Sequence, residues 1–248
     1  MLELKNISLS VEDEFSNNTQ KEILRDISFT VDSGKFVVIT GPNGGGKSTL
    51  AKTIAGILQP EKGQILLDGE DITGMNITER AKKGISFAFQ QPIRFKGITV
   101  RDLIGLAAGK EISDCQACSY LKQVGLCAKD YIDREVNASL SGGEIKRIEI
   151  ATVMARKTKL SIFDEPEAGI DLWSFARLTE TFEQIHSQGS ATMIIISHQE
   201  RIISLADEVI VVGDGTLRHR GTPKEILPRI LTDTLGGCPV LNKEVHAL

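Results

Sequence analysis

Short runs of apolar, β-branched residues alternate along the chain with longer segments whose apolar residues recur at helical spacing. Phe36–Thr40 is one such short run, and Leu160–Pro166 and Ala191–Gln199 are two more that end in polar residues. Runs of this length and composition predict buried strands. Thr49–Leu58 is apolar at helical spacing and predicts a helix. This alternation is typical of an α/β fold.

Two segments near the start of the chain indicate a second, antiparallel sheet laid against that α/β core. Leu2–Val11 alternates apolar and polar residues, and Ile23–Gly34 follows as a strand that ends in a turn. Gly63–Gly69 and Ile85–Gln91 predict two further strands, the second of them in the core. Val209–Gly221 predicts a hairpin.

Strand signals fade between Pro92 and Ser139, where helical segments dominate. We therefore expect residues 92–139 to form a helical subdomain, inserted into an α/β nucleotide-binding core made of residues 1–91 and 140–248. The last stretch, Pro228–Leu248, is weakly patterned, and we expect it to be partly mobile.

Charge and composition limit the classes of function. The 248 residues carry a formal net charge of −4, with a pI near 5.7, which argues against a general nucleic-acid binder. The longest apolar runs are far too short to span a bilayer, so direct membrane insertion is not expected. Met1–Ser10 lacks the pattern of a signal peptide, and we expect a cytoplasmic protein that reaches a membrane only through a partner.

The cysteines do not form a disulfide framework in a chain of this kind. Cys115 and Cys118 make a C-x-x-C pair with Cys127 nearby, but no second pair completes a zinc set. The surrounding segment is amphipathic, with Cys118 and Leu121 on one face. We expect buried or half-buried thiols without a ligand role, although iron contact stays open.

The segment GPNGGGKST, residues 41–49, carries the chemistry of the chain. Its spacing fits G-x-x-x-x-G-K-[ST], and it lies between a predicted strand and a predicted helix. Backbone N–H groups and the helix dipole then point at one anion site. Lys47 would reach the β- and γ-phosphates, and the Ser48 hydroxyl would bind Mg²⁺. The predicted nucleotide-binding residues are Gly41, Pro42, Asn43, Gly44, Gly45, Gly46, Lys47, Ser48 and Thr49.

Two other segments complete this prediction. Asp164 and Glu165 stand at the carboxyl end of a predicted strand, where ligands bind in open α/β sheets. Asp164 would hold Mg²⁺, and Glu165 would orient or deprotonate the attacking water. The segment LSGGE, Leu140–Glu144, places a serine and two glycines at a helix start and predicts a further phosphate contact.

In this order the motifs resemble those of the ATPase subunits of the ATP-binding cassette superfamily, over roughly Leu2 to Gly221. The matches are GPNGGGKST with Walker A, Gln90 with the Q-loop glutamine, LSGGE with the cassette signature, LSIFDE with Walker B, Ala168–Asp171 with the D-loop, and His198 with the switch histidine.

The resemblance implies an ATP-dependent, head-to-tail homodimer that holds two ATP molecules and Mg²⁺ between its protomers. Ser141, Gly142 and Gly143 would then add donors on the side of ATP opposite the other protomer's Walker A. It also implies catalytic roles for Glu165, His198, Gln90 and Lys47, Mg²⁺ binding by Ser48, Gln90 and Asp164, and a place for Asp171 in the nucleotide-binding set.

The adenine site departs from the family pattern. Many cassettes stack the base on an aromatic residue near the position of Val11, where this chain has none. Phe15 could substitute for it, so selectivity for ATP over GTP stays open.

Several residues beside the motifs resemble the ATPase of the SUF iron–sulfur cluster assembly system. That ATPase drives a soluble scaffold of paired β-helical subunits. Pro166 and the segment Ile93–Val100 instead resemble transporter cassettes. We therefore expect a compact SUF-type ATPase, with the nucleotide-binding subunit of a membrane transporter as the alternative. The SUF-like residues are Glu144, Lys146, Arg147, Glu149 and Glu167, of which Glu149 and Glu167 could also be solvated charges.

Overall fold

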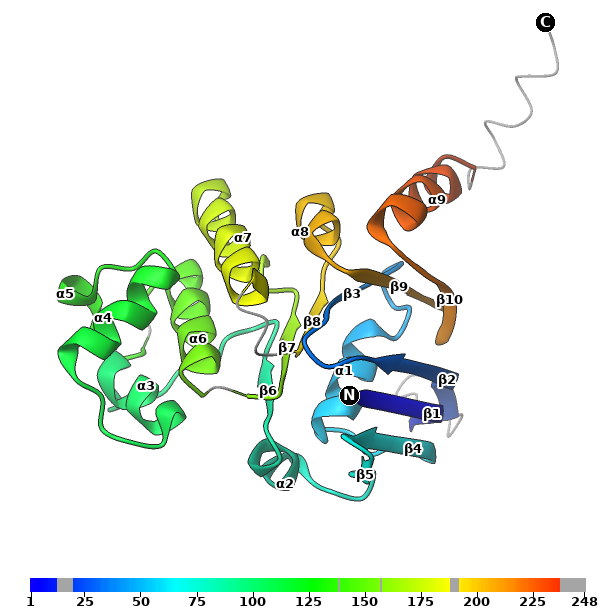
Figure 1. Ribbon diagram of the computed structural model, residues 1–248, viewed down its shortest axis with the longest axis horizontal. Helices are drawn as coiled ribbons and strands as arrows, with labels where there is room; N and C mark the ends of the chain where they lie inside the picture. The colour runs from blue at the N-terminus through cyan, green and yellow to red at the C-terminus, as the bar shows by residue number, and fades with distance from the viewer. Residues whose placement is uncertain (13–19, 138, 157, 188–191, 237–248) are drawn as a thin grey trace, which may run out of the picture.

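The computed structural model describes residues 1–12, 20–137, 139–156, 158–187 and 192–236, and it has the expected α/β architecture with two sheets (Figure 1). The smaller sheet is antiparallel, with the strand order β2-β1-β4-β5. It confirms the predicted N-terminal subdomain. Its strands are β1 (Leu2–Glu12), β2 (Gln20–Val31), β4 (Lys62–Leu67) and β5 (Glu70–Asp71).

The larger sheet has the order β10-β9-β3-β8-β7-β6, and only the predicted hairpin strand β10 runs antiparallel to its neighbour. Ile196 pairs with both Ile39 and Asp164, so three strands end at one edge of the sheet. The residues that follow these strands are thereby brought together. The strands are β3 (Phe36–Thr40), β6 (Ile85–Ala88), β7 (Leu160–Asp164), β8 (Thr192–Ile196), β9 (Glu208–Gly213) and β10 (Thr216–Gly221).

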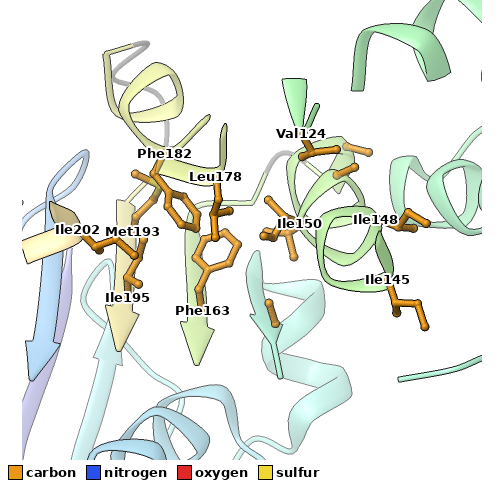
Figure 2. Close-up of a cluster of buried hydrophobic side chains, with 14 of the residues drawn as sticks. Val124, Ile145, Ile148, Ile150, Phe163, Leu178, Phe182, Met193, Ile195 and Ile202 are labelled. Atoms are coloured by element: carbon orange, nitrogen blue, oxygen red, sulfur yellow. The ribbon is translucent and has the colours of Figure 1, made fainter. Parts of the chain in front are cut away.

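Helices cover both faces of this sheet, which explains why β3, β7 and β8 are buried at every position. Helix α1 packs on one face. On the other, Leu178 and Phe182 of α7 pack against Phe163 and Met193 (Figure 2). The rings of Phe163 and Phe182 meet edge to face at 5.0 Å. The helices of the core are α1 (Lys47–Ala55), α2 (Ile77–Lys82), α6 (Gly142–Arg156), α7 (Leu172–Ser187), α8 (Glu200–Leu205) and α9 (Pro223–Gly236).

Between β6 and α6 the chain forms α3 (Val100–Ala108), α4 (Asp114–Gln123) and α5 (Ala128–Tyr131), which lie together beside α6 (Figure 1). Capping boxes begin α3 at Thr99 and α4 at Ser113. The exact division at residues 92 and 139 stays a prediction. The helical character expected up to Ser139 ends with α5, because carbonyls of the segment after it accept hydrogen bonds from the first N–H groups of α3.

The expectation of buried thiols on α4 is also wrong. Ala117 and Leu121, four residues apart, form the buried face of this helix, while Cys115 and Cys118 are exposed. Cys118 follows Ala117 directly in the sequence, so its side chain lies off that face. Within the described ranges, no group of three or more His, Cys, Asp or Glu side chains is arranged to hold a metal ion.

Helix α9 extends through Pro228 to Gly236, so the first part of the weakly patterned C-terminal stretch is helical. The Glu225 carboxylate accepts hydrogen bonds from the N–H and the hydroxyl of Thr222, just before the helix, and Ile226 is buried in the core. The expected mobility of residues 237–248 falls outside the described residues. Among the helices that the structure describes, none has the length and apolar character needed to cross a membrane.

Candidate nucleotide site

The loop after β3 has a backbone that only glycine can adopt at two positions. Gly41 has a φ of 135°, and a Cβ atom there would lie 2.0 Å from the carbonyl oxygen of Val212. Gly46 has a φ of 100° immediately before α1. Both values lie in the region that side chains disfavour. The backbone therefore forms the predicted phosphate-binding loop at the N-terminus of α1.

Lys47 is the first residue of α1, and its side chain lies across this loop. Its Nζ atom donates hydrogen bonds to the carbonyls of Gly41, at 2.8 Å, and Pro42, at 2.9 Å. Burial lowers the pKa of Lys47, and the carboxylates of Glu165 and Asp164 oppose that shift. The loop, its ammonium group and the helix N-terminus together suit a polyphosphate.

Ser48 and Asp164 come together as predicted. The Ser48 hydroxyl donates to Asp164 Oδ1 at 2.9 Å, and Asp164 is only 1% exposed. Burial raises the pKa of Asp164; the Ser48 hydrogen bond opposes this shift, while nearby Glu165 adds to it. A hydroxyl and a carboxylate beside a phosphate loop are the oxygen ligands that Mg²⁺ prefers, so these residues fit the ion.

Glu165 lies between two other predicted residues. Gln90 Nε2 donates to Glu165 Oε2 at 2.5 Å, and His198 Nε2 lies 3.8 Å from Glu165 Oε1. The backbone of Glu165 has a φ of 43°, which is uncommon for a residue with a side chain. Burial lowers the pKa of His198, Lys47 lowers it further, and Glu165 opposes both. The imidazole is therefore neutral near pH 7.

The signature serine and glycines lie at a separate helix start. The side chain of Glu144 accepts a hydrogen bond from the N–H of Ser141, and the Ser141 hydroxyl accepts one from the N–H of Glu144. This reciprocal pair begins α6 just before Gly142 and Gly143. Asp171 likewise begins α7 by accepting two hydrogen bonds from Ser174. Within the described residues, the side-chain hydrogen bonds of Ser141 and Asp171 stay within their own helix starts.

The charge pair of Lys146 and Glu149 connects α6 to the Q-loop. The sequence alone did not decide whether Glu149 is solvated. Lys146 is 1% exposed, and it donates to the carbonyls of Phe89 and Gln90. Glu149 accepts from the N–H of Phe89 at 2.9 Å, and its other oxygen lies 3.5 Å from the Lys146 ammonium. The alternative of a solvated Glu149 is therefore wrong. The three-residue spacing of the two charges on a helix was the available signal.

Glu167 also has a partner that the sequence did not indicate. Its Oε1 atom accepts a hydrogen bond from Ser197, whose hydroxyl also accepts one from the N–H of Gln199. Its Oε2 atom is buried. Burial raises the pKa of Glu167, and the Ser197 hydrogen bond opposes the shift. Glu167 thus joins the turn after β7 to the segment that carries His198. Phe15, the candidate adenine contact, lies outside the described residues.

Sequence comparison agrees with the motifs. Residues 24–168 match a protein-family model described as ABC transporter. An uncharacterised ABC transporter ATP-binding protein of Methanocaldococcus jannaschii is 40% identical over 226 residues, which are 88% of this chain and 90% of that protein. An energy-coupling factor transporter ATP-binding protein of Streptococcus sanguinis is 32% identical, over 95% of this chain and 84% of its own length.

Comparison with solved structures agrees with the fold. A dimeric ATP-binding cassette, solved with ADP and phosphate in a post-hydrolysis state, has a TM-score of 0.80 to this chain. The match covers 90% of this chain and 99% of that one at 21% sequence identity, so it shows a shared fold.

Proposed function

The chain belongs to the ABC transporter ATP-binding family, and from this premise we propose that it is the nucleotide-binding subunit of a membrane transporter. Members of the family bind ATP with Mg²⁺ and hydrolyse it, and so does this chain. The named relatives are transporter subunits, which supports this partner over a SUF-type scaffold. In this role the chain works on the cytoplasmic side of its partner.

For the hydrolysis step, we assign Glu165 to position and activate the attacking water. Its carboxylate is held by Gln90 and lies beside a neutral His198, which is free to donate a hydrogen bond to the transferred phosphoryl group. Lys47 offsets charge on the same group. Mg²⁺, when bound to Ser48 and Asp164, neutralises further charge.

We assign the exposed signature start, Ser141–Gly143, to a second copy of the chain. Ser141 and Gly142 are exposed at the N-terminus of α6, a position that favours an anion, and the side chain of Glu144 occupies only the N–H of Ser141 among the described contacts of these two residues. In a head-to-tail dimer it would cover the ATP bound at the other copy's loop. Binding energy from ATP then closes the dimer, and hydrolysis releases it.

The link from Gln90 to α6 is the observation that carries the proposed coupling to a partner. Gln90 contacts the catalytic carboxylate, and its neighbour Phe89 is held by the buried pair Lys146 and Glu149. Beside this link lies an apolar groove of about 180 Å³, in which Ile93 is 49% exposed. We propose that the transporter's membrane subunit docks there. The groove is lined by Phe87, Phe89, Ile93, Phe95, Leu103, Val136, Ile145, Ile148, Glu149, Thr152 and Val153.

A SUF-type scaffold is the second candidate partner. The residues that resemble that family are engaged in the structure rather than solvated: Glu144 bonds to Tyr131, Glu149 to Phe89 and Glu167 to Ser197. These contacts give the SUF-like residues a role in positioning the Q-loop, the signature helix and the switch segment. Because all of them lie within the chain, they do not favour a scaffold over a membrane subunit.

Native affinity purification with mass spectrometry, run with and without detergent, separates the two candidates. A multi-span membrane protein that is recovered only in detergent, and lost in an Ile93→Glu variant, is the expected result. Recovery of a soluble pair of scaffold subunits in both conditions would contradict the transporter role and establish the second candidate.

A further inference from the structure

Two large apolar side chains project from the start of α7. Leu172 is 75% exposed and Trp173 is 83% exposed. The same helix is anchored further along by Leu178 and Phe182 in the buried cluster (Figure 2). We call Leu172 and Trp173 the α7 patch. An adjacent leucine and tryptophan left in water are unusual, and such pairs mark interaction sites.

The α7 patch is continuous with the signature surface. Asp171, which begins α7, follows Ile170, and a Cβ atom on Gly143 would lie 3.4 Å from Ile170 Cγ2. Ser141 and Gly142, at the start of α6, are exposed on this side of the contact, as are Ala168 and Gly169. Any body that covers the signature start is therefore also close to Trp173.

A cavity of about 970 Å³ lies beside the phosphate loop, with an apolar wall on one part and the charged residues Glu200, Asp214 and Arg218 on another, and we call it the loop-side pocket. It reaches from Asn43 and His198 at the loop to an apolar wall, and its volume is in the range that encloses a drug-sized group. An indole ring with a neighbouring leucine fits that size and character. The apolar wall is formed by Ile203, Val211 and Leu227.

We propose that, in the ATP-bound dimer, the α7 patch of each copy packs into the loop-side pocket of the other. This rests on the proposed head-to-tail dimer. In an interface with two-fold symmetry, a surface beside the signature start must meet a surface beside the other copy's phosphate loop. The α7 patch and the loop-side pocket are the apolar features at those two places. The contact adds an aromatic anchor to an interface that otherwise depends on ATP.

Trp173 is the only tryptophan in the chain, so its fluorescence reports the contact directly. The experiment uses the Glu165→Gln protein, with and without ATP and Mg²⁺, and measures acrylamide quenching together with mass. We expect dimer formation to lower the quenching constant at least about twofold, because a ring that is 83% exposed becomes buried. Lys47→Ala should show neither change.

Substitutions test the pocket separately. In the Glu165→Gln protein, Trp173→Ala and Leu227→Ala should each raise the dimer dissociation constant, Trp173→Ala by about 30-fold, the size of an interface hot spot. The double variant should be hardly worse than Trp173→Ala, because the two residues share one contact. Leu106→Ala, at a side chain 70% exposed on α3, is the control and should change nothing.

The outcomes separate this contact from the proposed function. A dimer whose tryptophan is quenched as in the monomer would overturn the contact while leaving the ATP-driven dimer intact. Strictly additive effects of Trp173→Ala and Leu227→Ala would exclude the loop-side pocket as the acceptor. ATP binding without any dimer would overturn both the contact and the dimer on which it rests.

Discussion

Glu165 occupies a backbone conformation that costs free energy for a residue with a side chain, since its φ is 43°. In return, its carboxylate lies against Gln90 and near His198, at the edge where β3, β7 and β8 end. Ser48 and Asp164 occupy the same edge. At the scale of single residues, the site consists of polar side chains that lie close together because the parallel strands before them end at the same edge of the sheet.

Glu165→Gln tests the assignment of the catalytic carboxylate. The amide keeps the shape and the contact with Gln90 but is no base, so we expect turnover to fall by at least about 100-fold. ATP affinity, measured by isothermal titration, should stay within a few-fold of wild type. Turnover at the wild-type rate would remove Glu165 from this role.

The pH dependence of turnover tests His198. Burial lowers the pKa of its imidazole below the ordinary 6.5, so the neutral form is present at pH 7 and is lost as the pH falls through that lowered pKa. We expect kcat to hold from pH 8 to about 6.5 and to decline below that. In His198→Gln, kcat should be much lower than in the wild type and should no longer decline at acidic pH. An unchanged decline would assign this titration to another group.

At the scale of elements, α6 does two jobs. Its first turn presents Ser141 and Gly142, and its second turn carries Lys146 and Glu149, which hold the Q-loop backbone. Because these residues hold the Q-loop backbone, a movement of α6 also moves Gln90. The charged groups of Lys146 and Glu149 are buried, so removing one of the two charges lowers the free energy of unfolding far more than removing both.

Lys146→Met leaves the Glu149 carboxylate without its compensating charge. We expect the free energy of unfolding to fall by about 3–5 kcal/mol at pH 7, measured with urea. Burial already raises the pKa of Glu149, and losing Lys146 raises it further. The folded variant then binds a proton that the unfolded chain releases, so its stability should decrease as the pH rises from about 5 to 8.

The variant with both Lys146→Met and Glu149→Met is the matched control. It should recover most of the stability and lose the added pH dependence, because no buried charge remains. A Lys146→Met protein as stable as wild type at every pH would show that the pair is solvated in solution.

The sequence predicted the elements whose patterns are local. The strand–loop–helix around Lys47, the antiparallel sheet and the helices α3 and α4 follow from hydrophobic period and glycine spacing. The sequence did not indicate that α9 continues past Pro228 to Gly236, and the mobility expected of Pro228–Leu248 stays a prediction. The carbonyls of Phe89 and Gln90 that bind Lys146, and the Ser197 hydroxyl that binds Glu167, lie in segments distant in the chain, so no local pattern indicates these contacts.

At the scale of the whole molecule, three surfaces have distinct roles in this account. We propose that the signature start and the α7 patch face a second copy, that the phosphate loop holds ATP, and that the groove at Ile93 faces the transporter partner. The Q-loop lies between the second and third of these surfaces, since Gln90 contacts Glu165 while Phe89 lines the groove. The proposed function therefore predicts that nucleotide state and partner binding are coupled through these residues.

Ile93→Glu should weaken partner binding by about tenfold or more, because it puts a charge into an apolar groove. The ATPase rate of the isolated chain should stay within about twofold of wild type, because surface changes away from the site have small effects. Ile77→Glu, at a side chain 43% exposed on α2, is the matched control. Equal loss of partner binding in both variants would place the docking surface elsewhere.

Light scattering on the Glu165→Gln protein after size exclusion tests the central claim most directly. With ATP and Mg²⁺ present, we predict a mass twice that of the 27.0 kDa chain, and a return to 27.0 kDa when nucleotide is removed. A monomer that has bound ATP, at every protein concentration tested, would contradict the account.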